Sequence, residues 1–294
     1  MEFFFQLALN GVVVGSIYAL VALGFVIIYK SSGVLNFAQG EFLLLGGYVF
    51  WALVEGHAPW PYAAALTVAF SILLGLALER LILRPMIGEP IISVIMVTLG
   101  LSSVLKAIVL GAWGTDTRPY PALFSSEPIM LGPVPVSQGY LFSMLISAAL
   151  LLAFTLFFRY SRIGIAMRAT AFSQEVAQSM GISVRRIFAV SWSIAAVVSA
   201  LGGILLGALR GGVDGSLSVL GLKALPVVIL GGLDSIAGAI VGGLVIGVLE
   251  NLSGGYLDPI FGGGVKEVAP FAVLVLILMF RPYGLFGKVR IERV

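Results

Sequence analysis

The stretch that decides the fold is FFFQLALNGVVVGSIYALVALGFVIIY, Phe3–Tyr29, which contains no Asp, Glu, Lys or Arg. It is longer than the roughly 20 apolar residues that span the hydrocarbon core of a bilayer. A second charge-free run covers Pro128–Phe158. Because the first run follows only Met1 and Glu2 and lacks a basic start, it predicts a retained membrane span and not a cleaved signal peptide.

The composition of the whole chain agrees with a bilayer environment. Of its 294 residues, 60% are hydrophobic and only 11% are charged, and the mean hydropathy is +1.10. A soluble domain carries about 25% charged residues. There is no Cys, and His57 is the single His, so disulfides, thiol catalysis and Cys-ligated metal are excluded and we expect no metal site.

Charge-poor stretches separated by polar, Gly or Pro breaks predict an all-α, polytopic transmembrane bundle of eight or nine spans, some of them broken or re-entrant. The whole chain, 1–294, is one membrane domain. The expected spans are 4–29, 36–54, 60–80, 91–112, 138–158, 187–209, 220–233, 235–251 and 266–281. The pair 220–233 and 235–251 is the open point, because Gly231, Gly232 and Asp234 interrupt it; one span or a re-entrant hairpin also fits.

The placement of basic residues predicts the orientation. One alternating set of loops holds twelve of the seventeen Lys and Arg residues, namely Lys30, Arg80, Arg84, Arg159, Arg162, Arg168, Arg185, Arg186, Arg281, Lys288, Arg290 and Arg293. By the positive-inside rule these loops and the C-terminus are cytoplasmic, and nine spans would put the N-terminus outside. The net charge of +3 then reflects membrane topology, and we expect no nucleic-acid partner.

The segment Leu35–Glu41 carries polar side chains where a span should begin. Only thirteen charge-free residues follow Glu41, about 20 Å of helix against a core of roughly 30 Å. Asn36, Gln39 and Glu41 are therefore expected at membrane depth, at an unwound or re-entrant helix start facing the bundle interior, as candidates for a translocation path. The alternative is a polar helix start at the interface, with Asn36 as N-cap.

The loop 159–186 holds five arginines and a short amphipathic helix. Ser173 is a suitable N-cap, Gly181 a suitable left-handed C-terminal residue, and Phe172, Val176, Ala177 and Met180 are expected on one helix face. Such a helix suits a groove on a cytoplasmic partner. Anionic lipid headgroups are the other possible contact.

Enzyme motifs are missing from the sequence. It contains no H-E-x-x-H, no G-x-S-x-G and no Walker A motif, so any nucleotide that drives the protein must bind another chain. Glycine-rich spacings such as Gly238–Gly242 predict close helix packing. The candidates for ion coupling within the membrane are Glu41, Lys106, Asp234 and Glu250.

Several stretches, taken in order, resemble the LivH-type permease family of branched-chain amino-acid ABC importers over essentially the whole chain. They are Asn10–Leu20, Leu35–Glu41, Arg162–Ala169 running to Gly181–Ile182, Gly221–Ala224 running into Gly231–Ala239, and Arg281–Gly287. The chain departs from the family at Gln39, often His there, and at Ala237, often Pro.

The resemblance implies a permease subunit, not an enzyme, that forms half of an alternating-access path in a bacterial inner membrane. Its implied partners are a second related permease, two cytoplasmic ATPase subunits that bind ATP, and a periplasmic substrate-binding protein; no cofactor is implied on this chain. The family's coupling loop maps to Arg162–Arg186. The loop residues expected to contact the ATPase are Arg162, Gly164, Arg168, Phe172, Glu175, Val176, Met180 and Gly181.

Branched-chain amino acids are the expected substrates, while urea, short amides or aromatic acids are alternatives within the same importer class. A different class is a stand-alone channel or ion-coupled carrier, which should show a charge pair buried in the membrane.

Overall fold

A computed structural model describes residues 2–120, 123, 128–131 and 134–287. The helices are α1 (Glu2–Ser32), α2 (Gln39–Glu55), α3 (Trp60–Leu78), α4 (Ile91–Trp113), α5 (Gln138–Tyr160), α6 (Arg162–Phe172), α7 (Gln174–Ser179), α8 (Val184–Arg210), α9 (Leu217–Leu222), α10 (Ala224–Gly231), α11 (Ile236–Tyr256), α12 (Asp258–Phe261) and α13 (Val265–Phe280). A π-helical turn (Glu79–Leu83) and a 3₁₀ turn (Arg84–Met86) extend α3.

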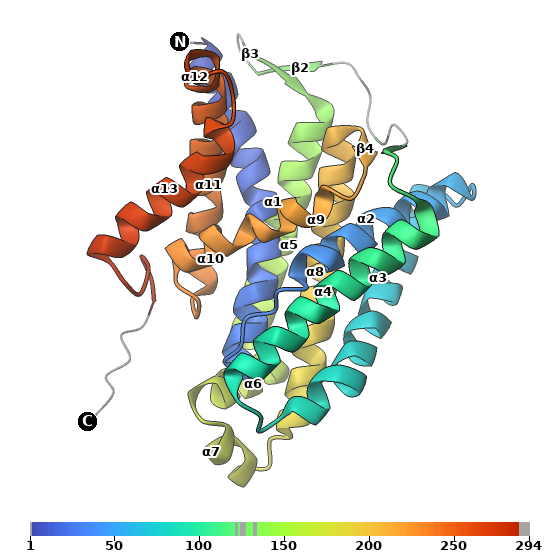
Figure 1. Ribbon diagram of the computed structural model, residues 1–294, viewed down its shortest axis with the longest axis vertical. Coiled ribbons are helices and arrows are strands. Elements are labelled where there is room, and N and C mark those ends of the chain that lie inside the picture. Colours follow the sequence, from blue (N-terminus) through green and yellow to red (C-terminus); the bar gives the residue numbers. More distant parts are fainter. Residues whose placement is uncertain (1, 121–122, 124–127, 132–133, 288–294) are drawn as a thin grey trace.

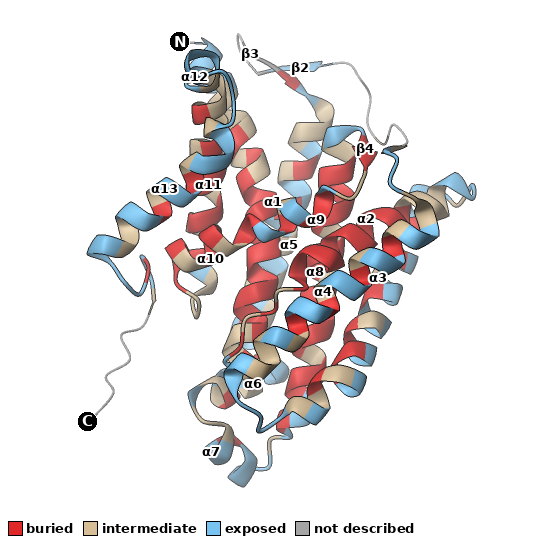
Figure 2. Cartoon of the chain, in the orientation of Figure 1, coloured by how far each residue is buried: buried red, intermediate tan, exposed pale blue. Residues whose placement is uncertain are grey.

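Two long helices, α1 and α8, form the centre of the bundle and run in opposite directions (Figure 1). Their residues are mostly buried, whereas α3, α4, α5 and α13 expose apolar side chains on their outer sides (Figure 2). Exposed Leu, Ile and Phe on long apolar helices are the expected surface of a protein whose solvent is lipid. The core therefore lies along α1 and α8.

Glycines allow α1 to pack directly against α11. A Cβ on Gly15 would lie 2.5 Å from the carbonyl oxygen of Gly243, and one on Gly247 would collide with the backbones of Gly11 and Gly15. Likewise Gly238 and Gly242 of α11 meet the backbone of α10. The close packing predicted from the glycine spacings is confirmed, and it brings backbone dipoles and carbonyls of neighbouring helices into contact.

Helix α2 begins inside the bundle. After α1 ends at Ser32, the chain runs without helix to Ala38 and rises to the middle of the molecule (Figure 1). There Gln39 meets Ser199, near the centre of α8, and Gly40 packs on Ser218 and Gly221 of α9. The expectation of an unwound start facing the interior is therefore met by the geometry.

A second broken segment follows α8. Residues 217–231 form the short helices α9 and α10, interrupted at Lys223, and Gly232, with φ of +103°, turns the chain toward α11. An L side chain rarely adopts this φ, so glycine is needed at the turn. Thus each central helix, α1 and α8, is followed by a short helix that lies against the middle of the bundle.

Six helices in the described part of the chain are long and apolar enough to cross a membrane. They are Glu2–Ser32, Trp60–Met86, Ile91–Trp113, Gln138–Tyr160, Val184–Arg210 and Ile236–Tyr256. The predicted count of eight or nine spans is not confirmed, because α2 has 17 residues, α13 has 16, and 217–231 is shorter still. Seventeen helical residues reach only about 25 Å.

Short strands lie at the end of the bundle that also holds the start of α1 (Figure 1). Strands β2 (Pro128–Leu131) and β3 (Val134–Ser137) form a hairpin, and β1 (Arg118–Pro119) pairs with β4 (Gly212–Val213). The opposite end carries α6 and α7. The predicted cytoplasmic basic residues Lys288, Arg290 and Arg293 lie outside the described residues.

Candidate functional site

The turn before α2 is held by its own amide side chains. Asn36 accepts a hydrogen bond at Oδ1 from the backbone N–H of Ala38 (3.0 Å) and donates from Nδ2 to Oε1 of Gln39 (3.2 Å). Asn36 is thus an Asx-type turn residue just ahead of the helix. Asn36 and Gln39 are fully buried and Glu41 is 3% exposed. Asn36 is not the N-cap of α2, because Ala38 holds that position.

Gln39 connects three helices at the centre of the bundle. Its Nε2 donates to the Ser199 hydroxyl (2.6 Å) and to the Ala195 carbonyl (3.3 Å), both on α8. On α1, Gly24 lies beneath the same amide, because a Cβ at that position would collide with it. The Gln39 amide therefore occupies the space that a side chain at position 24 would otherwise fill.

Glu41 lies between α2 and α4. The hydrogen bond from the Phe37 N–H to Thr98 sets the register of the two helices, so Ser102 of α4 is the neighbour of Glu41, and Lys106 lies one turn further along α4. Its Oε2 atom is buried with no hydrogen-bond partner. The Glu41 side chain is therefore enclosed within the bundle.

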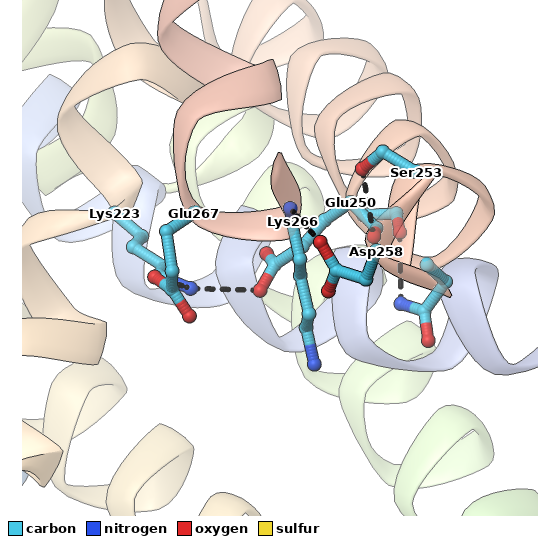
Figure 3. A network of polar contacts seen from close by, with 8 residues as sticks. Lys223, Glu250, Ser253, Asp258, Lys266 and Glu267 are labelled. Carbon is cyan, nitrogen blue, oxygen red and sulfur yellow. Dashed lines mark hydrogen bonds and ion pairs between the residues drawn. The ribbon is translucent and has the colours of Figure 1, made fainter. Parts of the chain in front are cut away.

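A second polar cluster joins α9, α10, α11 and α13 (Figure 3). The Lys223 ammonium is 2.7 Å from Oε1 of Glu250 on α11 and 2.7 Å from Oε2 of Glu267 on α13. The Lys223 and Glu250 side chains are 7% and 3% exposed, whereas Glu267 is 61% exposed. Through these two ion pairs Lys223 links the break between α9 and α10 to α11 and α13.

The predicted short helix of the basic loop is present at the α7 end of the molecule. Ser173 caps α7 by accepting from the N–H of Val176 (3.3 Å). After the helix, Gly181 has φ of +81°, its N–H bonds the Gln178 carbonyl, and the N–H of Ile182 bonds the Ala177 carbonyl. These are the two hydrogen bonds of a Schellman motif, and Gly181 occupies its left-handed position.

The predicted helix face is divided between two helices, because Phe172 ends α6, Ser173 is extended, and only Val176 and Ala177 lie within α7, with Met180 as its C-cap. Phe172, Val176 and Met180 are 91%, 58% and 78% exposed, but Ala177 is buried. The prediction that Ala177 shares their face is therefore wrong: a helix of 100° per residue sends neighbours 176 and 177 apart, and Ala177 packs inward. Arg162, Glu175 and Gly181 are exposed.

Two other predicted loop residues lie against the end of α5. Arg168 donates from its guanidinium to the carbonyls of Phe158 and Arg159, in the last turn of α5. These carbonyls have no partner within the helix, and a cation there is favourable. Gly164 is buried, and a Cβ on it would collide with the Phe158 carbonyl. Both residues fix the corner between α5 and α6.

Sequence reasoning missed two partners of the polar clusters. Ser199 looked like an ordinary small residue within a span, and Glu267 like a charge at a span end; only tertiary contact gives them roles. Lys223, a charge at the edge of an apolar stretch, was the available signal. Within the residues that the structure describes, no group of three or more His, Asp or Glu side chains is arranged to hold a metal ion.

A multi-pass apolar bundle with buried polar groups at two helix breaks is typical of membrane transport proteins. The chain belongs to the family described as the permease component of the branched-chain amino acid transport system, which it matches over residues 7–280. The resemblance drawn from the sequence is confirmed.

Individual relatives agree with this assignment. The high-affinity branched-chain amino acid permease protein LivH of Escherichia coli is 32% identical, over 99% of this chain and 98% of the relative. LivM of the same organism is 26% identical, over 93% of this chain and 68% of the relative. A chain of the PsaBC complex of Streptococcus pneumoniae, solved with a Fab, has a TM-score of 0.50 at 17% identity, covering 94% of this chain and 91% of that chain, and shows likeness of fold.

Proposed function

We propose that this chain is one permease subunit of an ABC importer for branched-chain amino acids in a bacterial inner membrane. It pairs with a second, related permease, receives substrate from a periplasmic binding protein, and is powered by two cytoplasmic subunits that hydrolyse ATP. The similarity to both LivH and LivM supports a paired permease. The C-terminus and the α6–α7 segment face the cytoplasm, and the N-terminus faces outward.

The observation that carries the proposal is the exposure of three apolar side chains, Phe172, Val176 and Met180, in the α6–α7 segment at one end of the bundle. Three large apolar side chains on a short, capped segment favour a protein groove as their contact. Arg185 and Arg186 are exposed just beyond Gly181. ATP-driven closure of the partner subunits then pushes on α7, and the corner fixed by Arg168 passes the movement to α5.

Asn36, Gln39 and Glu41 form part of the translocation path. They lie where two broken segments meet, and a break at mid-depth gives a hinge between the halves of the bundle. Hydrolysis on the partners tilts the helices around this centre and exposes it to alternate sides.

The second candidate is a stand-alone ion-coupled carrier, and one observation favours it: Lys223 and Glu250 form the buried charge pair that this class requires. Such pairs also hold helices together in lipid without coupling to an ion. Family membership favours the importer, and urea, short amides and aromatic acids remain its alternative substrates.

The test uses the complete importer reconstituted in vesicles. Val176→Asp or Met180→Asp should reduce leucine uptake at least tenfold while the variant still inserts, because a carboxylate on a docked face must be desolvated without a partner. Gln178→Asp, an exposed change outside the apolar triplet, is the matched control and should leave uptake near wild type. Equal uptake by all three variants would count against docking through α7, and uptake without the ATPase subunits would favour the carrier.

A further inference from the structure

Polar residues of α2 (Glu41 and Tyr48) and of α4 (Thr98, Ser102 and Lys106) lie along the contact between these two helices, which we call the polar lane. Two contacts mark its ends. The backbone N–H of Phe37 donates to the Thr98 hydroxyl (3.3 Å), and the rings of Tyr48 and Trp113 stack with centroids 5.6 Å apart. Both pairs advance in the same direction along the chain, so α2 and α4 lie side by side and parallel. Residues between these contacts on the facing sides must then lie opposite one another.

Helical spacing places three polar residues of α4 along this lane. Thr98, Ser102 and Lys106 are four residues apart and so form one face. On α2, Glu41 and Tyr48 are seven apart and share the face toward α4. Thr98 is buried, while Ser102 and Lys106 are half-buried. The lane is therefore buried at Thr98 and partly exposed at Ser102 and Lys106.

The lane contains polar groups that the chain itself does not satisfy. Glu41 Oε2 and the Tyr48 hydroxyl are buried without hydrogen-bond partners. No ion pair within 4.0 Å joins Lys106 to Glu41 among the described residues. A buried carboxylate oxygen without a partner is costly, and it is a typical feature of a site completed by a ligand.

We propose that Glu41, Ser102 and Lys106 form a binding site for the zwitterionic backbone of an amino acid. The substrate ammonium binds the Glu41 carboxylate, its carboxylate binds the Lys106 ammonium, and the Ser102 hydroxyl lies between them. A zwitterion placed in this way neutralises both charges at once, and the buried Leu45 and Leu105 of the same two helices supply apolar neighbours for an aliphatic side chain. The proposal rests on the proposed function and assigns the substrate contacts to α4 as well as to the α2 start.

The chain has no cysteine, so one introduced thiol reports on one position. The first experiment labels Ser102→Cys with a small methanethiosulfonate in the assembled importer, with and without leucine-loaded binding protein. Leucine should slow labelling several-fold at position 102. Ser103→Cys, on the neighbouring exposed side of α4, is the matched control and should label at the same rate in both conditions. Unprotected labelling at 102, or equal protection at both positions, would overturn the site.

The second experiment measures uptake and ATP hydrolysis by the same complex. Glu41→Gln and Lys106→Met should each reduce leucine uptake at least tenfold while the complex still assembles, which its ATP hydrolysis reports. Wild-type uptake in both variants would refute the site. If the wild-type complex itself imports no leucine but does import another solute, the proposed substrate fails; if it imports leucine and the variants are normal, only the site fails.

Discussion

The buried ammonium of Lys223 gives the sharpest test of the energetics. Lys223→Met leaves the Glu250 carboxylate, 3% exposed, without its cation. Breaking a buried ion pair in this way costs about 3–5 kcal/mol, because the remaining charge stays desolvated. At about 2–4 °C per kcal/mol for a chain of this size, the melting temperature should fall by about 6–20 °C.

Glu267 supplies an internal control, since it contacts the same ammonium at the same 2.7 Å but is 61% exposed. Glu267→Gln should cost no more than about 1 kcal/mol, because water screens an exposed ion pair. The double variant Lys223→Met with Glu250→Met removes both charges and should recover most of the lost stability.

The assay is thermal unfolding of the purified chain in one detergent, followed by intrinsic fluorescence of its four tryptophans. If Glu267→Gln lowers the melting temperature as much as Lys223→Met, burial does not set the energetics of this cluster. A double variant no more stable than Lys223→Met would equally refute the reasoning.

Two further predictions concern packing and pH. Gly247→Ala should destabilise the chain by about 1–3 kcal/mol in the same assay, because its methyl group would collide with the α1 backbone, whereas Gly100→Ala on the open side of α4 should be close to neutral. At the strand end of the bundle, burial raises the pKa of Asp214, but hydrogen bonds from Ser216, the charge of Arg210 and a bond from Thr117 outweigh it and hold that pKa below its usual value. Because the pKa of Asp214 is lower in the folded than in the unfolded chain, its ionised carboxylate stabilises the folded state at pH values above the unfolded pKa, about 3.9. This stabilisation is lost as the pH falls through the folded pKa. Hydrogen exchange at the Ser216 amide, relative to its intrinsic rate, should therefore accelerate below about pH 4 in the wild type, and Asp214→Asn should not show this acid dependence.

Local signals in the sequence were sufficient for the membrane class and for the basic loop. The charge-free run Phe3–Tyr29 predicted α1, because a segment that crosses lipid must satisfy its backbone N–H and C=O groups internally, and a helix does so. Ser173 and Gly181 predicted the bounds of α7, because caps act through hydrogen bonds and φ angles of adjacent residues. The burial of Asn36 and Glu41 was predicted from the charge-free run after Glu41, which is too short to cross the membrane alone.

Other features depend on which helices meet, and the sequence alone left them open. Ala177 faces inward because α7 packs on the bundle. The count of eight or nine spans was not confirmed, because α2, α9 and α10 begin inside the bundle. Asn36 and Gln39 are close in sequence, so their hydrogen bond was within reach of local reasoning. Lys223 and Glu267 are far apart along the chain, and a pairing between such distant residues depends on helix register, which only tertiary packing decides.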